Sequence, residues 1–479
     1  MVRRFAGAAL AGGLLGLPFA VDFVYGPTIF RDHYWPHDHR ITYIGFGLMV
    51  CLGLASFRTS WALLRSERPW PVPLLERTPS PLLLVVVLAA ILRLLLAALI
   101  YGTEDVRTFQ TEALDILSGL DVYRPEQKVY FYLPGVAYLT TASQWLSQAT
   151  GFSYHFLMKF PSIAGDLATI AMLWWATGGA AKGGTLRLRR SLLMAVNPLS
   201  LMITGVHGQY DPLGAAALFA ALLVATSGCR DRIFGAGSLA ALAVYIKNWP
   251  LMLVPPALLG LDGWGRRVRA AVWMGVLLTA VSFLFVPGDR MNMLRSNMRY
   301  PTANLHWGPG GLFRAATEAS PAIARAVPKL DFDRARKSIP LVSLLLFYWW
   351  TRNSRDRVRQ LVGAYLLFST VSISFATQYT TWALPAVLML DFSPLACWFV
   401  MANGLWVWVL DGGYHAFHVL RLLTGSHAAT LTVTAATSML PWLGGLVWFV
   451  VLFVPRTATE PTEESPFGAR PAEETAPGA

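Results

Sequence analysis

Stretches of apolar residues recur along the whole chain, separated by short polar or basic segments. A helix needs about 20 residues to cross the hydrocarbon core of a bilayer, and several of the stretches approach this length while others are shorter. We therefore predict an all-α integral membrane protein, a polytopic bundle of about 11–14 transmembrane helices in which some segments are bent, re-entrant or merged. The predicted helices cover residues 5–25, 41–57, 81–101, 154–177, 190–206, 213–228, 233–246, 249–261, 269–286, 339–351, 360–376, 380–391, 394–411 and 438–454.

Composition agrees with this pattern. Hydrophobic residues make up 55% of the chain and charged residues 14%, with a mean hydropathy of +0.47, whereas soluble proteins carry about 25% charged residues. The 18 Trp and 16 Tyr residues suit aromatic belts at the membrane surfaces. In a soluble protein the net charge of +12 would favour nucleic acid, but here much of it lies in short loops, so no nucleic-acid partner is expected.

The cysteines and the N-terminus add little chemistry. The three cysteines lie in or near apolar stretches without a Cys-x-x-Cys or Cys/His cluster, so neither a disulfide framework nor a zinc site is expected. The apolar stretch at 5–25 follows Arg3 and Arg4 and could be a signal peptide. Because no convincing cleavage site precedes a soluble domain, a retained first helix is preferred.

Basic residues predict the orientation of the helices. Arg and Lys gather in alternate short loops, which marks those loops as cytoplasmic. This places both termini in the cytoplasm, and the Pro-, Glu- and Ala-rich tail 456–479 is expected to be disordered there. The basic loops are residues 3–4, 65–77, 182–190, 230–232, 266–269 and 352–359.

The opposite side, here called the far side, receives a long first loop that begins with Glu104 and Asp105. Apolar residues recur at helical spacing over 105–119, which predicts an amphipathic helix ending at Gly119. Asp105 is suited to cap the start of this helix, and that structural role competes with a chemical one. A second short helix after Pro134 is expected to lie along the membrane surface as well.

Other polar groups fall on the same side. His207, Gln209 and Asp211 lie together in a turn, which can serve either a ligand or its own helix ends. Lys247 interrupts an apolar stretch and either reaches the headgroups or contacts a phosphate. Asp166 lies several residues inside a predicted span, where pairing with a basic neighbour is the expected role.

Two further segments complete the far side. The long loop 287–338 is rich in arginine, including Arg295 and Arg299, and suits a phosphorylated lipid headgroup, or else a solvated surface touching anionic lipid. It also holds Asn304 and His306 beside a Gly/Pro turn. The side chains Gln378, Tyr379 and Trp382 are typical of sugar contacts and equally of an aromatic girdle at the membrane surface.

Five segments, in order, resemble those of the GT-C superfamily of membrane glycosyltransferases. They are TEDVRTFQTEALDILSGLDVY with YFYLPG, KFPSIAGDLATIAMLWW, NPLSLMITGVHGQYDPLGAAALFAALL, YIKNWPLMLVPP and ATQYTTWALP. The likeness spans roughly residues 100–390 and is nearest to bacterial mannosyltransferases that use polyprenol-phosphate mannose. It implies residues 1–80 as two added helices with a cytoplasmic loop, 81–391 as the catalytic membrane core, 392–455 as C-terminal helices and 456–479 as the tail.

The resemblance implies roles for particular residues. Asp105 matches the acidic residue that acts as general base, and Glu104 is the nearby alternative, because some relatives carry an aspartate pair there. Lys247, with Arg295 and Arg299, would bind the donor phosphate. The residues expected to contact the substrates are His207, Gln209, Asp211, Tyr123, Asn304, His306, Gln378, Tyr379 and Trp382.

The reaction implied is inverting transfer of a sugar from a polyprenyl-phosphate donor to a hydroxyl of a glycolipid or polysaccharide, with protein as a further acceptor class. Mannose is the first choice for this sugar, followed by arabinofuranose or glucose. The transfer takes place on the far side of what the Arg-, Ala- and Gly-rich composition suggests is a bacterial plasma membrane. No cofactor is certain, although Glu104 and Asp105 could hold a divalent cation weakly. Two other readings remain: a transporter or flippase of a lipid-linked sugar, and a non-catalytic membrane protein of envelope assembly.

Overall fold

The computed structural model describes residues 16–20, 39–65, 72–124, 130, 132–178, 183–227, 231–285, 290–298, 307–320, 322–323, 332–372, 375–390, 392–410 and 427–453. Every regular element among these residues is a helix, which confirms the all-α prediction. Arg299, Asn304, His306, the tail 456–479 and most of the predicted helix 5–25 lie outside the described residues.

The helices keep the order expected from the apolar stretches, with more breaks. In chain order they are α2 (His39–Leu64), α3 (Val72–Glu76), α4 (Pro81–Leu99), α5 (Glu104–Leu117), α6 (Pro134–Thr150), α7 (Tyr154–Leu157), α8 (Phe160–Ala176), α9 (Gly183–Ala195), α10 (Pro198–Leu201), η1 (Met202–His207), α11 (Asp211–Thr226), α12 (Arg232–Ile246), η2 (Trp249–Leu253), α13 (Pro255–Leu259), α14 (Trp264–Phe285), α15 (Arg290–Met298), α16 (Gly308–Ala319), α18 (Phe332–Trp350), α19 (Arg357–Val371), η3 (Thr377–Thr381), α20 (Leu384–Met389), α21 (Pro394–Val407) and α23 (His427–Phe453).

Several of these helices have the length and apolar composition of membrane spans. Four described segments qualify fully, and five shorter apolar segments of 10–17 residues join them. This supports a membrane protein, while the expected total of about 11–14 spans and the four-region division stay predictions. The four are Gly47–Leu64, Pro81–Leu99, Tyr154–Ala176 and Ala429–Phe453.

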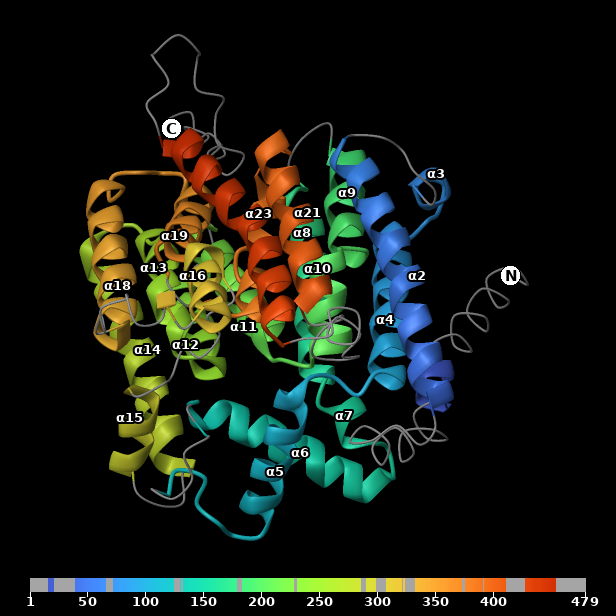
Figure 1. The fold of residues 1–479 in the computed structure, drawn as a ribbon. Helices are drawn as coiled ribbons and strands as arrows, with labels where there is room; N and C mark the ends of the chain where they lie inside the picture. The colour runs from blue at the N-terminus through green and yellow to red at the C-terminus, as the bar shows by residue number, and fades with distance from the viewer. Residues whose placement is uncertain are drawn as a thin grey trace, which may run out of the picture.

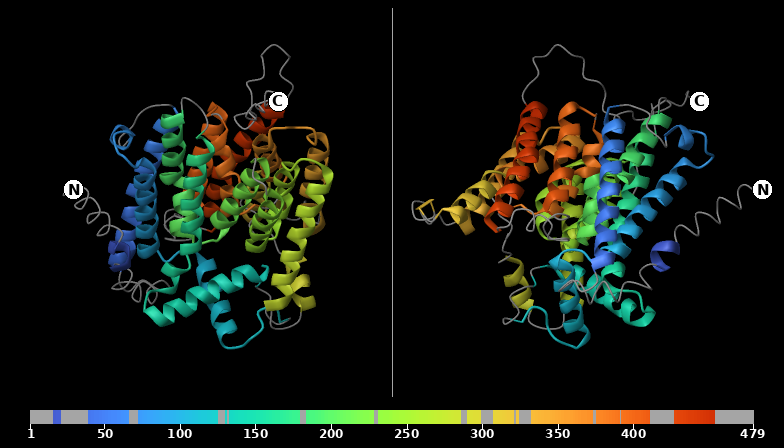
Figure 2. Two further views of the ribbon diagram at one scale, coloured as in Figure 1. Left: turned by 180° about the vertical axis from the view of Figure 1, so that it is seen from behind. Right: turned by 45° about the vertical axis from the view of Figure 1, so that its right-hand side comes forward.

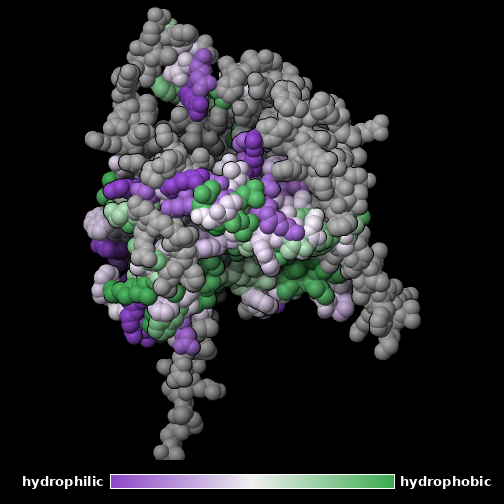
Figure 3. Space-filling model, turned by 90° about the horizontal axis from the view of Figure 1, so that it is seen from below, coloured by the Kyte–Doolittle hydropathy of each residue, from purple (hydrophilic) through white to green (hydrophobic). Residues whose placement is uncertain are grey.

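The bundle carries a layer of helices at one end. Figures 1 and 2 show α5, α6 and α7 beneath the long helices, together with α15, whereas α3 lies at the opposite end. Viewed from below, hydrophobic and hydrophilic areas lie side by side on this face (Figure 3). The exposed apolar side chains of the layer include Leu114 and Leu117 on α5 and Trp145 and Leu146 on α6, as expected for helices that lie along a membrane surface.

The predicted span 190–206 is not a single helix. It breaks after α9 because Pro198 cannot donate a backbone hydrogen bond, and α10 starts there. The Asn197 side chain accepts hydrogen bonds from the backbone N–H groups of Leu199 and Ser200 and so caps the new helix. The chain then widens into the π-helix η1, a rare geometry found mostly as single turns and often at functional sites.

Behind this break lies a buried polar network. The guanidinium group of Arg93 on α4 forms an ion pair with Asp166 on α8, with Nε and Oδ2 2.7 Å apart. Arg93 also donates to the backbone oxygens of Met194 and Ala195 at the end of α9, and the Thr204 hydroxyl of η1 donates to Asp166. The predicted pairing of Asp166 is therefore confirmed, and the network fixes the start of η1 against two helices.

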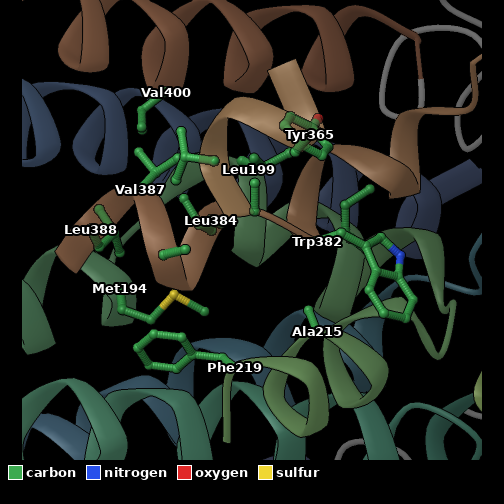
Figure 4. Close-up of a cluster of buried hydrophobic side chains, with 14 of the residues drawn as sticks. Met194, Leu199, Ala215, Phe219, Tyr365, Trp382, Leu384, Val387, Leu388 and Val400 are labelled. Carbon is green, nitrogen blue, oxygen red and sulfur yellow. The ribbon is translucent and has the colours of Figure 1, made fainter. Parts of the chain in front are cut away.

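An apolar cluster fills the centre of the bundle. Figure 4 shows Met194, Leu199 and Phe219 facing Leu384 and Val387, with Trp382 at the edge of the cluster. These side chains come from α9, α10, α11, α20 and the residue that follows η3, and they are almost fully buried. The same packing holds η1 and the start of α11 in place, and the candidate site lies along their ends.

Candidate functional site

The site is organised around the first turn of α5. The helix begins at Glu104 with Thr103 as its N-cap residue, so the prediction that Asp105 caps the helix is wrong. Asp105 lies one residue inside the helix, and its side chain reaches across to the turn that follows η1. The start of a helix carries a partial positive charge from unpaired N–H groups, which favours a carboxylate there.

Two side chains of that turn hold the Asp105 carboxylate. The amide Nε2 of Gln209 donates to Oδ2 at 2.6 Å, and Nε2 of His207 lies 3.3 Å from the same oxygen. The Asp105 side chain is nevertheless 46% exposed. Both contacts fall on Oδ2, and the other oxygen, Oδ1, accepts no hydrogen bond from the described part of the chain.

This setting lowers the pKa of Asp105. Partial burial acts to raise it, but the hydrogen bonds from His207 and Gln209 and the positive charge of Lys247 outweigh burial and bring the pKa to about 2. The carboxylate is therefore ionised near neutral pH. Because the charge of Lys247 helps to lower this pKa, its ammonium group is close enough to Asp105 to interact with it electrostatically.

Backbone geometry brings the two segments together. The Thr103 hydroxyl donates to the backbone oxygen of His207 at 3.3 Å. Gly102 and Gly208 adopt positive φ angles of 122° and 79°, which side chains other than glycine rarely tolerate. Each glycine lets its segment turn sharply next to the other, so the Asp105 helix and the His207–Gln209 turn meet directly.

A second cluster surrounds Lys247, the residue that ends α12. Its Nζ lies 2.7 Å from Oδ2 of Asp211, and the other oxygen, Oδ1, accepts a hydrogen bond from the indole of Trp382 at 2.6 Å. All three side chains are almost fully buried. Both Asp211 oxygens therefore have partners within the protein, and Asp211 supports Lys247. The contact with substrate that the sequence predicted for Asp211 stays a prediction.

Lys247 retains capacity to donate hydrogen bonds. Its contact with Asp211 has the distance of an ion pair but not the angles of a hydrogen bond, and among the described residues no oxygen accepts a hydrogen bond from Nζ. The rings of Tyr132 and Tyr379 lie 5.4 and 5.3 Å from Nζ, in the range of cation–π contacts. The charge is thus stabilised by one carboxylate and two aromatic faces.

Aromatic side chains close this cluster. Trp249 packs against Tyr379 and Trp382, with ring centroids 4.6 and 5.1 Å apart, and stacks on Phe368 at 5.0 Å. Gln378, next to Tyr379 on η3, is 5% exposed, and its side-chain oxygen accepts from Thr377. Sequence reasoning missed Tyr132 and Trp249, although YFYLPG and KNWP were the segments that contain them.

The remaining described candidate residues have other surroundings. The Glu104 side chain is 75% exposed and lies 3.9 Å from Arg107, whereas Asp105 turns inward, so the two adjacent acids have different partners. The Tyr123 hydroxyl donates to the backbone oxygen of Tyr132, and Arg295 is exposed on α15. Within the described chain no three His, Cys, Asp or Glu side chains converge, and a weak cation at Glu104 and Asp105 stays a prediction.

A second acid of α5 was not anticipated. Glu112 lies seven residues after Asp105 and so on the same face of the helix, and it is almost fully buried. Neither oxygen forms a hydrogen bond to the described residues. Burial, reinforced by the negative charges of Asp105 and Asp115, raises the pKa of Glu112 well above its usual value. The i, i+7 spacing in the sequence was the signal that could have revealed it.

Comparison with known protein families identifies the chain. Residues 130–375, just over half of it, match the family model described as Glycosyltransferase family 87. The chain belongs to glycosyltransferase family 87. The matched region includes His207, Gln209, Asp211 and Lys247, while Asp105 precedes it and Trp382 follows it.

Membership of family 87 establishes a membrane glycosyltransferase, with a sugar donor and a sugar acceptor as its substrates. No curated protein and no solved structure matched the chain. The family therefore gives the class of reaction, and the geometry of the site indicates which residues can carry it out.

Proposed function

We propose that this family 87 glycosyltransferase moves a sugar, most simply mannose, from a polyprenyl-phosphate donor to a hydroxyl group of a glycolipid or polysaccharide, with inversion at the anomeric carbon. The reaction takes place at the outer surface of a bacterial plasma membrane. The observation that carries the proposal is the Asp105 carboxylate, held on Oδ2 by Gln209 and His207, with no described residue donating a hydrogen bond to Oδ1, at the layer of surface helices and within reach of the buried Lys247 charge.

Asp105 serves as the base. The acceptor oxygen attacks the anomeric carbon while the bond from that carbon to the phosphate oxygen breaks, and the electron pair leaves with the phosphate. The acceptor proton passes to Oδ1 of Asp105. A carboxylate with a pKa of about 2 is a weak base, so it takes the proton late, once the attacking oxygen has become strongly acidic, and its negative charge stabilises the cationic sugar throughout.

The positive charge of Lys247 assists the leaving group. The departing lipid phosphate gains negative charge, which a nearby fixed cation stabilises without reorganisation. The unused hydrogen-bond donors of Nζ favour this role, and Asp211 and Trp382 keep the ammonium group in place. Arg295 and Arg299 are proposed to contact the phosphate as well.

The acceptor and donor sugars are proposed to lie between the Asp105 and Lys247 clusters. His207 and Gln209 orient Asp105, while Gln378, Tyr379 and Trp382 line the aromatic side. Tyr123, Asn304 and His306 are assigned to the outer contacts. Glu104 is left out of the chemistry because its exposed side chain lies beside Arg107, and the mechanism includes no cation.

The test is a transfer assay with purified protein and radiolabelled polyprenyl-phosphate sugars, offered one at a time with membrane glycolipid as acceptor. We expect mannose to be transferred and Asp105→Asn to lower the rate by about 10²–10⁴-fold. Glu104→Gln, which removes the adjacent acid, is the matched control and should leave the transfer rate unchanged. Equal activity of the Asp105→Asn and wild-type proteins would remove the base assignment, and consumption of a nucleotide sugar alone would remove the lipid donor.

A further inference from the structure

Lys159 connects the two segments that form the Asp105 site. It lies between α7 and α8, and its side chain is fully buried. Nζ donates to the backbone oxygen of Ile100 at 2.5 Å and to that of Gly205 at 3.0 Å. Ile100 ends α4 five residues before Asp105, and Gly205 lies in η1 two residues before His207. One ammonium group therefore joins the chain on both sides of the site.

The packing around this contact leaves little freedom. A Cβ atom on Gly205 would lie 2.7 Å from the side chain of Leu96, so only glycine allows η1 to approach α4 this closely. The Ser162 hydroxyl, one turn along α8 from Lys159, donates to the backbone oxygen of Gln209. The start of α8 thus contacts η1 at Gly205, the turn after η1 at Gln209, and the residue that follows α4.

Burying an ammonium group is costly unless it is well satisfied by hydrogen bonds. Lys159 meets this condition with carbonyl groups at a helix C-terminus, where backbone oxygens lack partners and carry partial negative charge. A shorter or apolar side chain at this position would leave both carbonyl groups without that donor. The ammonium group of Lys159 therefore keeps the backbone at Ile100 close to the backbone at Gly205.

Building on the proposed function, we propose that Lys159 is a positioning residue that holds the segment from Ile100 to Asp105 against the turn from Gly205 to Gln209, and so sets the alignment of the Asp105 carboxylate with His207 and Gln209. Lys159 does not touch the substrates. It acts through the backbone, and its loss weakens both contacts to Oδ2 of Asp105 at once.

The titration of Asp105 reports this alignment directly. The groups that act on its carboxylate are His207 and Gln209 from the turn after η1, Lys247 from α12 and Glu112 from α5. Of these, the first two donate the hydrogen bonds that lower its pKa. If the two segments move apart, the pKa of Asp105 should return toward its ordinary value of about 4.

The experiment uses the full-length protein in detergent and the variant Lys159→Met, whose unbranched side chain is one atom shorter and removes the charge. The Asp105 carboxylate is followed by infrared difference spectroscopy against the Asp105→Asn variant of each protein, from pH 7 to pH 3.5. We expect no protonation in the wild type and a midpoint near pH 4 in Lys159→Met. In the transfer assay kcat should fall about 10²-fold, as for a misplacement of about 1 Å, with a much smaller change in KM.

Two further variants complete the test. Thr169→Val removes a hydroxyl that donates within α8, far from the site in sequence, and is expected to match the wild type in both measurements. Thr103→Val removes the weaker Thr103–His207 contact and should shift Asp105 in the same direction by less, which carries the test if Lys159→Met does not fold.

The outcomes separate the two proposals. An unchanged Asp105 titration in Lys159→Met, or in Thr103→Val where Lys159→Met is not folded, would overturn the positioning role. A shifted titration in a protein that transfers no sugar would retain the positioning role and overturn the proposed function instead.

Discussion

At the scale of single residues, helix α5 carries two acids on one face whose surroundings move their pKa values in opposite directions. Asp105 accepts hydrogen bonds from His207 and Gln209 and has a pKa of about 2. Glu112 is buried, accepts no hydrogen bond from the described residues and has a raised pKa. The pair illustrates how hydrogen bonding and burial move the pKa of the same chemical group in opposite directions within two helical turns.

Replacing Gln209 by Ala should raise the pKa of Asp105, because the shorter of its two hydrogen bonds is lost. An aspartate with a lowered pKa adds stability above its unfolded value of about 4, and this is lost as the pH falls through the folded value. In Gln209→Ala this contribution should be smaller, and its loss should be complete at a higher pH. The measurement is the rate of transfer and the thermal unfolding temperature between pH 3.5 and 7, and identical pH profiles would contradict the prediction.

Replacing Glu112 by Gln should stabilise the protein at alkaline pH. A carboxyl group whose pKa is raised on folding adds stability below the unfolded value of about 4.3, and this stability is lost as the pH rises through the folded value. A glutamine does not titrate. We expect the unfolding temperature of Glu112→Gln, relative to that of the wild type, to rise as the pH increases above about 4.3, with the exposed Glu104→Gln as control. A constant difference across this range would argue against a raised pKa.

At the scale of elements, the site depends on two sharp backbone turns that bring α5 to η1. Gly102 has a φ of 122°, and a Cβ there would lie 2.6 Å from the Val106 side chain and 3.1 Å from the backbone oxygen of Val206. Gly119 at the other end of α5 also has a positive φ, of 78°, but open space around it. Gly102 is needed both for its positive φ angle and for the close approach of α5 to η1, whereas Gly119 is needed for its positive φ angle alone.

The variant Gly102→Ala should therefore lose sugar transfer, whereas Gly119→Ala should keep it. Both pay about 1–3 kcal/mol in backbone strain, so both should unfold more easily. Only Gly102→Ala forces the start of α5, with Asp105, away from His207. Transfer rates and unfolding temperatures of the two variants measured together provide the check, and equal activities would show that the approach of α5 to η1 does not matter.

At the scale of the whole molecule, the candidate residues gather at one end of a helical bundle. The layer of α5, α6 and α7 covers this end, and α3 lies at the other (Figures 1 and 2). The basic loops predict that the α3 end lies in the cytoplasm, by the positive-inside rule. The site would then face the outer surface of the membrane, where a lipid-linked donor rather than a nucleotide sugar is the appropriate substrate.

This orientation can be tested with single cysteines in a protein whose Cys51, Cys229 and Cys397 have been replaced. Ser118→Cys at the end of α5 should react with a membrane-impermeant maleimide in intact cells, because the side chain is exposed on the surface layer. Glu76→Cys on α3, also exposed, should react only after the cells are opened. The reverse pattern would place the site in the cytoplasm and contradict a lipid-linked donor used outside.

Much of the fold follows from local pattern. The apolar stretches and the 3.6-residue period of α5 predicted helices that the structure contains, since such a pattern depends only on neighbouring residues. The break at Pro198 was missed, because a proline inside an apolar stretch interrupts a helix only when other elements supply the lost contacts. The N-cap role of Asp105 failed for a similar reason, since Thr103 occupies that position.

By itself, the sequence determined that this protein is a helical membrane protein, that its basic residues gather in alternate loops, and which polar residues are candidates for the site. Tertiary structure alone decided that Asp105 and not Glu104 turns toward His207 and Gln209, that Asp211 and Trp382 hold Lys247, and that Lys159 joins the two halves of the site. These facts rest on contacts between residues far apart in the chain. Hydrophobic periodicity acts over a few residues, whereas hydrogen bonds and ion pairs at buried positions depend on which helices pack together.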